Sequence, residues 1–326
     1  MNLSPEVKAQ LEEQKKNCVF CKIVSGETQG QIIYKDAVMT GMLDINPAVK
    51  GHALFMPLEH YPILPFLPPE TFSHLFGRLP AIVATVKKAM VAPAATVFIA
   101  NGGAAGQQTP HFLAHVFPRE QGDGISLSGK PSPTTDLSAF SKSLNAVMTE
   151  HFNRNPGKGA VKSSSSLYED DLVTCEALGQ PWGKGHIVLT IPGKEFDQLD
   201  EDASRRLFTV ASYASSILFE SFQAHGTNLI VHTGPSEDNP SGFRLHLLPR
   251  WQDDGLNLTW NPLPTKPNLE EIKSRLHDEF FVLEHTPSRP KQETREDTSE
   301  KLQKILEKTQ KSPDTEIERA INEARK

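Results

Sequence analysis

Short apolar runs alternate along the chain with longer stretches in which apolar positions recur at helical spacing. The short runs predict strands and the longer stretches predict amphipathic helices. Strands are expected over residues 32–34, 38–43, 51–57, 96–100 and 111–117. Helices are expected over residues 4–16, 69–91 and 136–152, and Pro80 is expected to kink or split the second of them.

The strand predicted over 111–117 carries histidines on one face. Alternation of side chains along a strand places His111, Leu113 and His115 on the same side. The segment before it, from Asn101 to Gln107, is rich in glycine and alanine, which lets backbone N–H groups approach an anion. Two imidazoles beside such a loop indicate a phosphate site.

The pattern of the first half begins again after residues 153–166, which have the composition of a linker. Lys184-Gly-His186 then repeats Lys50-Gly-His52. Further matches share a constant offset of 131 without a gap, among them Thr96/Thr227, Ile99/Ile230, Gly103/Gly234, Phe112/Phe243, His115/His246, Pro118/Pro249 and Arg119/Arg250. These matches predict an internal duplication.

The composition is that of a soluble globular protein, since 37% of the 326 residues are hydrophobic and 23% are charged. The net charge of −6 gives no support for nucleic-acid binding through a global positive field. No run reaches the length of a membrane span and the N-terminus lacks the apolar segment of a signal peptide, so we expect no membrane partner. Three cysteines do not make a disulfide framework, and a cytoplasmic location is expected.

The segment around the histidines resembles the signature of the histidine triad (HIT) superfamily, in which three histidines alternate with apolar residues, follow a Gly-Gln loop and precede Pro-Arg. The residues that match are Gly106, Gln107, His111, His115, Pro118 and Arg119. Leu113 departs from the signature, because it occupies the middle position, where the superfamily carries its nucleophilic histidine. In the second half the three positions read Gly242, Arg244 and His246.

The resemblance implies an α+β fold, with an antiparallel sheet and a long helix in each half. Two tandem HIT-like domains would pack as an intrachain pseudo-dimer. We expect an N-terminal helix over 1–17, a first domain over 18–152, a linker over 153–166, a second, degenerate domain over 167–284 and a charged tail over 285–326. The mixed charge of the tail predicts a helical or disordered segment that could dock a protein or RNA partner.

Cys18 and Cys21 have the Cys-x-x-Cys spacing of metal ligands. In some members of the superfamily such a pair binds zinc together with a histidine after the Gly-His strand and the first histidine of the triad. The resemblance assigns these roles to His60 and His111 and implies a structural Zn²⁺. The residues alone leave another interpretation open, in which the thiols are buried apolar side chains or a redox pair.

A nucleotide pocket is the second site that the resemblance implies. A carboxylate in the turn before Gly-His contacts the ribose in the superfamily, and the Gly-Gln loop surrounds the α-phosphate. The residues concerned here are Asp44, Asn101, Gly106, Gln107 and His115. The alternative for Asp44 is that it caps its turn. Structural roles are expected for His52, His186 and His246, and a surface or loop position for His232.

Catalysis is doubtful because Leu113 has no lone pair with which to attack phosphorus. His115 lies one strand repeat further on, roughly 6–7 Å away, which destroys in-line geometry. Arg244 is no nucleophile at neutral pH. The sequence therefore predicts a catalytically impaired protein that binds a nucleotide, an RNA end or a protein partner. The alternative is a nucleotidyl hydrolase or transferase acting on an α-phosphate with a rearranged nucleophile such as His115.

Overall fold

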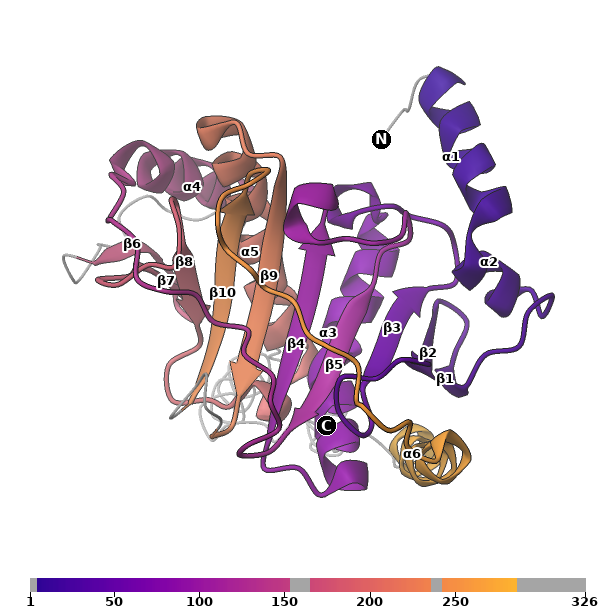
Figure 1. The fold of residues 1–326 in the computed structure, drawn as a ribbon. Coiled ribbons are helices and arrows are strands. Elements are labelled where there is room, and N and C mark those ends of the chain that lie inside the picture. The colour runs from indigo at the N-terminus through magenta and orange to yellow at the C-terminus, as the bar shows by residue number, and fades with distance from the viewer. Residues whose placement is uncertain (1–4, 153–164, 236–241, 286–326) are drawn as a thin grey trace, which may run out of the picture. The chain divides into compact units, whose positions relative to one another are not determined.

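An antiparallel sheet of ten strands forms the centre of the protein, in the order β1-β2-β3-β5-β4-β9-β10-β8-β7-β6 (Figure 1). The computed structural model describes residues 5–152, 165–235 and 242–285. The strands are β1 (Ile32–Lys35), β2 (Met39–Leu43), β3 (Ala53–Pro57), β4 (Ala94–Asn101), β5 (Ala114–Arg119), β6 (Ser166–Glu169), β7 (Thr174–Ala177), β8 (Ile187–Thr190), β9 (Gly226–Thr233) and β10 (Phe243–Arg250). The order reads the same from either edge when β1–β5 are matched with β6–β10.

The helices are α1 (Pro5–Asn17), α2 (Val19–Val24), α3 (Pro69–Met90), α4 (Ser138–His151), α5 (Glu201–Phe222) and α6 (Leu269–His285), with short 3₁₀ turns η1 (Leu64–Phe66), η2 (Gly103–Ala105) and η3 (Phe196–Gln198). The long helices α3 and α5 cover one face of the sheet (Figure 1). The main hydrophobic core lies between them and the sheet, and Phe76 of α3 stacks there on Phe208 of α5 with ring centroids 4.2 Å apart. Within the described ranges, no helix is both long and apolar enough to cross a membrane.

Pro80 lies inside α3, which runs through it as one helix, so the expectation that proline might split the segment is wrong. Proline has no N–H, and the carbonyl of Phe76 one turn earlier therefore loses its helical donor. The hydroxyl of Ser204 in α5 donates to that carbonyl at 2.6 Å. A helix from the second half thus satisfies the group that Pro80 leaves without its usual partner.

The last helix of each half packs against the other half. Although α4 follows β5, it lies beside β6, and the Ser141 hydroxyl donates to the carbonyl of Leu167 at 2.6 Å. Although α6 follows β10, it reaches β1, where the rings of Phe280 and Tyr34 are 5.3 Å apart. The segments that lead to α4 and α6 therefore cross the seam between β4 and β9 in opposite directions (Figure 1).

The strand register corrects the alignment of the two halves. Arg119 pairs with Ala94 across β5 and β4, and Arg250 pairs with Gly226 across β10 and β9. The arginines are 131 residues apart, whereas Ala94 and Gly226 are 132 apart. A constant, gapless offset of 131 is therefore wrong for β4 and β9. The second half has one residue fewer between these strands, and a slip of one residue would turn every side chain of β9 to the opposite face.

Several predicted boundaries shift by a few residues. β5 begins at Ala114, so His111 and Leu113 precede the strand rather than lie in it. β6 begins at Ser166, inside the predicted linker, and residues 153–164 of that linker lie outside the described residues. The charged tail predicted over 285–326 lies outside them as well, apart from His285 at the end of α6.

Candidate functional site

Two cysteines and two histidines of the first half come together near α2. Cys18 immediately precedes α2 and Cys21 lies in its first turn, so both thiols reach the same side of the helix. His60 follows β3 and His111 precedes β5. One ligand atom from each of the four residues lies within 4.8 Å of every other. The structure therefore brings together the whole set of metal ligands that the resemblance implies.

The distances and protonation states of this cluster fit a tetrahedral metal. Sγ of Cys18 lies 3.4 Å from Nδ1 of His111, and Sγ of Cys21 lies 3.3 Å from Nδ1 of His60. Zinc–ligand bonds of about 2.3 Å to sulfur and about 2.0 Å to nitrogen place neighbouring tetrahedral ligands roughly 3.5 Å apart. Nε2 of His111 donates to the carbonyl of Pro57 at 3.1 Å, which leaves a lone pair on Nδ1 toward the thiols.

Burial also sets the pKa values of these ligands. It lowers the pKa of His111 to about 4, so that the imidazole is neutral, as a metal ligand must be. Burial and the neighbouring Cys18 raise the pKa of the Cys21 thiol to about 12. A bound cation would reverse the shift of Cys21, because metal coordination displaces the thiol proton.

A cavity of about 310 Å³ lies next to this cluster, on the sheet face away from α3 and α5. Four residues of the predicted nucleotide site line it: Asp44, Gly106, Gln107 and His115. Asp44 also caps its turn by accepting from the N–H of Asn46 at 2.7 Å, and burial raises the pKa of its carboxyl group. Among the described residues, neither lysine nor arginine lines the cavity.

The backbone of the loop between β4 and His111 bonds largely to itself. The N–H groups of Ala105 and Gln107 donate to the carbonyl of Gly102 at 3.0 and 3.3 Å, and the N–H of Gly106 donates to that of Gly103 at 3.0 Å. The expected cradle of backbone donors is therefore turned inward over Ala105–Gln107. These three amides hold the shape of the loop instead of facing an anion.

The carboxamides of two predicted nucleotide ligands are engaged in contacts within the protein. Oε1 of Gln107 accepts from the N–H of Gly102 at 2.8 Å, and its Nε2 donates to the carbonyl of Thr109 at 2.8 Å. Asn101 does not line the cavity; its Oδ1 accepts from the N–H of Leu64 at 3.0 Å, and its Nδ2 donates to Oγ1 of Thr227 at 3.3 Å. The Gln107 carboxamide braces the loop, whereas the Asn101 carboxamide joins the end of β4 to η1 and β9.

Leu113 lines the cavity and packs against an apolar cluster that includes Cys18, Phe20 and Leu54. The middle position of the triad is thus part of an apolar wall. This wall continues to the candidate metal ligands, so Leu113 packs against the same cluster as Phe20 of α2.

Thr109 and Trp260 are among the lining residues that the sequence interpretation did not assign to the site. Oγ1 of Thr109 is buried and has no hydrogen-bond partner among the described residues, and the residue lines the cavity. Trp260, from the segment that crosses the seam after β10, places its ring 5.0 Å from that of His115 and 5.3 Å from that of Phe98. Thr109 lies within the recognised motif and could have been included, whereas no local sequence pattern predicts the position of Trp260.

A hydrogen-bonded relay fixes the proton of His115. Nδ1 of His52 lies 3.4 Å from the N–H of Ala48 and 3.7 Å from Oδ2 of Asp44. With the closer Ala48 N–H as its donor, the proton of this imidazole lies on Nε2. That N–H donates to Nδ1 of His115 at 3.1 Å, which leaves the proton of His115 on its own Nε2. Burial lowers the pKa of both imidazoles, that of His115 to about 4, so both are neutral. Nε2 of His115 is therefore a hydrogen-bond donor and not a nucleophile.

The second half repeats the imidazole pair and fills the space beside it. Nδ1 of His186 accepts from the N–H of Trp182 at 2.9 Å, and its Nε2 donates to Nδ1 of His246 at 3.0 Å. The ring of Trp182 stacks on His246 at 4.3 Å and 10°. His232, expected on the surface, is instead buried in the central strand β9, where Nδ1 lies 3.0 Å from Oγ1 of Thr96.

Comparison with known proteins identifies the family. The pattern of the HIT domain matches residues 25–122. An uncharacterized HIT-like protein of Methanocaldococcus jannaschii is 35% identical over 127 residues, which make up 39% of this chain and 98% of that relative. The chain belongs to the HIT family. The family expected from the histidine motif is thereby confirmed.

Two further relatives match a somewhat smaller share of the chain. Adenylylsulfatase HINT3 of Arabidopsis thaliana is 34% identical over 120 residues, which are 37% of this chain and 61% of that protein. The chain therefore spans less than two thirds of the length of that relative. A zinc-bound histidine triad family protein of Mycobacterium smegmatis is 35% identical, with a TM-score of 0.33 over 36% of this chain and 86% of the other.

Proposed function

We propose that this HIT-family protein binds a nucleotide in the cavity of its first half and does not catalyse a reaction on it. The observation that carries the proposal is Leu113, which lines the cavity where a nucleophile would stand. Nδ1 of His111 faces the thiols and Nε2 of His115 carries a proton. None of the three side chains offers a lone pair to a phosphorus atom.

The groups around the cavity suit a ligand of low negative charge. Nε2–H of His115 would donate to a phosphate oxygen, and Asp44 would accept from ribose hydroxyls. Trp260 offers an aromatic surface to a base. Without lysine or arginine among the described lining residues, a nucleoside monophosphate or its ester is favoured over a polyphosphate. The name of the Arabidopsis relative supports an adenylyl group as the first probe.

We propose that Cys18, Cys21, His60 and His111 hold a structural zinc ion. The support is the donor set of two thiols and two imidazoles, together with the spacing of their ligand atoms. Four protein ligands close the coordination sphere, which is typical of structural and not of catalytic zinc. When bound, zinc would tie α2 to the segments before and after the cavity.

We infer that the two halves form tandem HIT-like units packed as an intrachain pseudo-dimer, in which the second half acts as a scaffold. The palindromic order of the sheet and the exchange of α4 and α6 support this inference. In the second half Arg244 is exposed and Trp182 covers His246. A protein or RNA partner docking on the tail stays a prediction, as does the cytoplasmic location.

A nucleotidyl hydrolase or transferase is the second candidate. It is favoured by the position of His115 in the cavity wall and by the enzyme name of the Arabidopsis relative. His115 could act as a nucleophile only if the proton relay through His52 reversed its direction, since Nε2 must lose its proton.

Titration calorimetry with AMP tests the binding proposal. We expect saturable binding that weakens roughly tenfold in His115→Leu, because this variant loses the hydrogen bond from Nε2 to the phosphate. Thr28→Val changes an exposed threonine and serves as the control that keeps wild-type affinity. The absence of binding to wild-type protein, or equal affinities in all three proteins, would contradict the proposal.

A further inference from the structure

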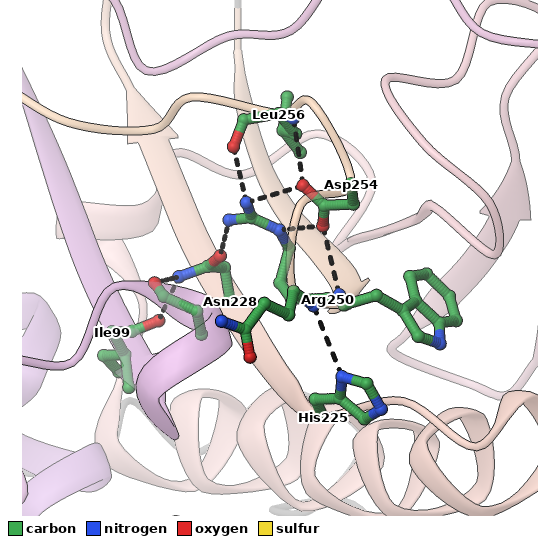
Figure 2. Close-up of polar contacts among 9 residues, drawn as sticks. Ile99, His225, Asn228, Arg250, Asp254 and Leu256 are labelled. Atoms are coloured by element: carbon green, nitrogen blue, oxygen red, sulfur yellow. Dashed lines mark hydrogen bonds and ion pairs between the residues drawn. The ribbon is translucent and has the colours of Figure 1, made fainter.

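Arg250 in the second half is a buried arginine whose guanidinium group is held on several sides (Figure 2). Its Nε and Nη2 donate to the carboxylate of Asp254 at 2.7 and 3.0 Å, and Nη2 also donates to the carbonyl of Leu256. Its Nη1 donates to Oδ1 of Asn228 at 2.7 Å. With Arg250 only 5% exposed, these bonds fix the orientation of the Asn228 carboxamide.

The other end of that carboxamide reaches the first half. Nδ2 of Asn228 donates to the carbonyl of Ala105 at 2.9 Å and lies 3.5 Å from that of Ile99 (Figure 2). Asn228 is fully buried, so a lost partner could not be replaced by bulk water. Ala105 ends η2 and directly precedes Gly106 and Gln107 of the cavity wall. A side chain of β9 therefore holds the loop that shapes the first-half cavity.

The backbone at the start of β9 meets the same loop at close range. A Cβ atom on Gly226 would lie 2.6 Å from the carbonyl oxygen of Asn101 and 3.2 Å from the amide nitrogen of Ala105. A Cβ atom on Gly102, whose φ is +91°, would lie 3.0 Å from the carbonyl oxygen of His225. The two backbones fit together because both positions are glycine.

The first half has the matching arginine, but its contacts lead elsewhere. Arg119 donates to Asp123 through Nε and Nη2 at 2.5 and 3.0 Å, and its Nη1 donates to Oγ1 of Thr96 at 3.1 Å. The register makes Thr96 the counterpart of Asn228. Thr96 contacts the imidazole of His232 and not a loop carbonyl. The second half therefore stabilises the first-half loop through Arg250 and Asn228, and, among the described residues, the first half makes no equivalent contact through Arg119 and Thr96.

We propose that Asn228, held by Arg250, is a positioning residue for the cavity of the first half. The second half would then be needed for binding although its own imidazole pair is covered. Release of the Ala105 carbonyl would let Gly106 and Gln107 move relative to His115. The effect on affinity rests on the proposed nucleotide binding, whereas the effect on the loop does not.

Asn228→Asp is the sharpest test, because the side chain keeps its size and its acceptor for Arg250 but loses the donor to Ala105. Hydrogen–deuterium exchange of the ligand-free protein measures the protection of the amides of residues 102–107. Calorimetry measures the affinity of the cavity for AMP. We expect loop exchange to accelerate roughly tenfold and AMP affinity to fall roughly tenfold, while exchange in β1–β3 is unchanged. Asn228→Ser, which is neutral, gives the same test if the added carboxylate prevents folding.

Thr96→Val is the matched control, since it removes the acceptor of the equivalent arginine without touching the loop. We expect wild-type loop exchange and AMP affinity in this variant. Unchanged loop exchange in both Asn228 variants, or equal acceleration in Thr96→Val, would overturn the proposal. If the wild-type protein does not bind AMP and the Asn228→Asp loop still exchanges faster, nucleotide binding fails while the positioning of the loop stands.

Discussion

Nε2 of His52 lies 3.1 Å from Nδ1 of His115, and the same contact recurs at 3.0 Å between His186 and His246. In each pair a backbone N–H donates to Nδ1 of the first imidazole, so the proton has the same direction in both halves. The halves differ in what lies beside the pair. A cavity adjoins His115, whereas the ring of Trp182 stacks on His246.

The buried imidazole of His186 should make stability depend on pH. Burial lowers its pKa to about 3, against about 6.5 in the unfolded chain. Between these values the unfolded chain binds a proton that the folded protein does not, so the free energy of unfolding falls as the pH drops below 6.5. Relative to His186→Gln, the wild-type protein should lose up to about 1.4 kcal/mol more per pH unit. Denaturant unfolding at pH 7, 6 and 5 measures the difference, and parallel curves would contradict it.

Removal of the metal should loosen the first half. We expect elemental analysis to find one zinc per chain and Cys18→Ser to lose it, with a fall in Tm on the order of 10 °C. Cys175→Ser is the control, because Cys175 is buried in the core away from the cluster and should keep the metal. A zinc-free wild-type protein with an unchanged Tm after chelation would exclude a structural metal.

Leu113→His restores a nucleophile in the cavity wall. If Leu113 is the reason for inactivity, the variant should release AMP from adenosine 5′-phosphoramidate on the order of 100-fold faster than the wild-type protein. Leu113→Gln has a polar side chain without a nucleophilic nitrogen and should stay inactive. Equal rates for the two variants would mean that the inward-turned loop amides, and not Leu113, prevent the reaction.

Substitution of Trp182 should affect stability, whereas substitution of Trp260 should affect AMP binding. Trp182→Ala removes the ring stacked on His246 and should lower the free energy of unfolding by about 3 kcal/mol, with little change in AMP affinity. Trp260→Ala removes a ring that lines the first-half cavity and should weaken AMP binding. Chemical denaturation and calorimetry on both variants check this, and a loss of affinity in Trp182→Ala would show that the assignment is wrong.

The parts of the fold with local signals could be predicted from the sequence. The strands, the long helices and the Cys-x-x-Cys spacing depend on residues close together in the chain. The candidate metal ligands were predicted through the family resemblance, which links Cys18 to His60 and His111, and the structure brings these residues together.

Features set by contacts between distant segments could not be predicted. The carbonyl of Phe76, which lacks a helical donor because of Pro80, accepts a hydrogen bond from Ser204 of the other half. Trp260 reaches the cavity on a segment that crosses the seam. Equivalent residues of β4 and β9 are identified by strand pairing across the sheet. The alignment of the two halves by sequence alone therefore placed them one residue out of register. Asn101 does not line the cavity, and its carboxamide bonds to Leu64 and Thr227, which are distant in the sequence.

The central claim is that the cavity beside Leu113 binds nucleotides without cleaving them. The most direct measurement is AMP release from adenosine 5′-phosphoramidate by zinc-loaded protein, followed by ³¹P NMR alongside calorimetric binding of the same compound. The account predicts saturable binding and no release above the buffer rate. Release that scales with protein concentration and disappears in His115→Ala, but not in Thr28→Val, would contradict it.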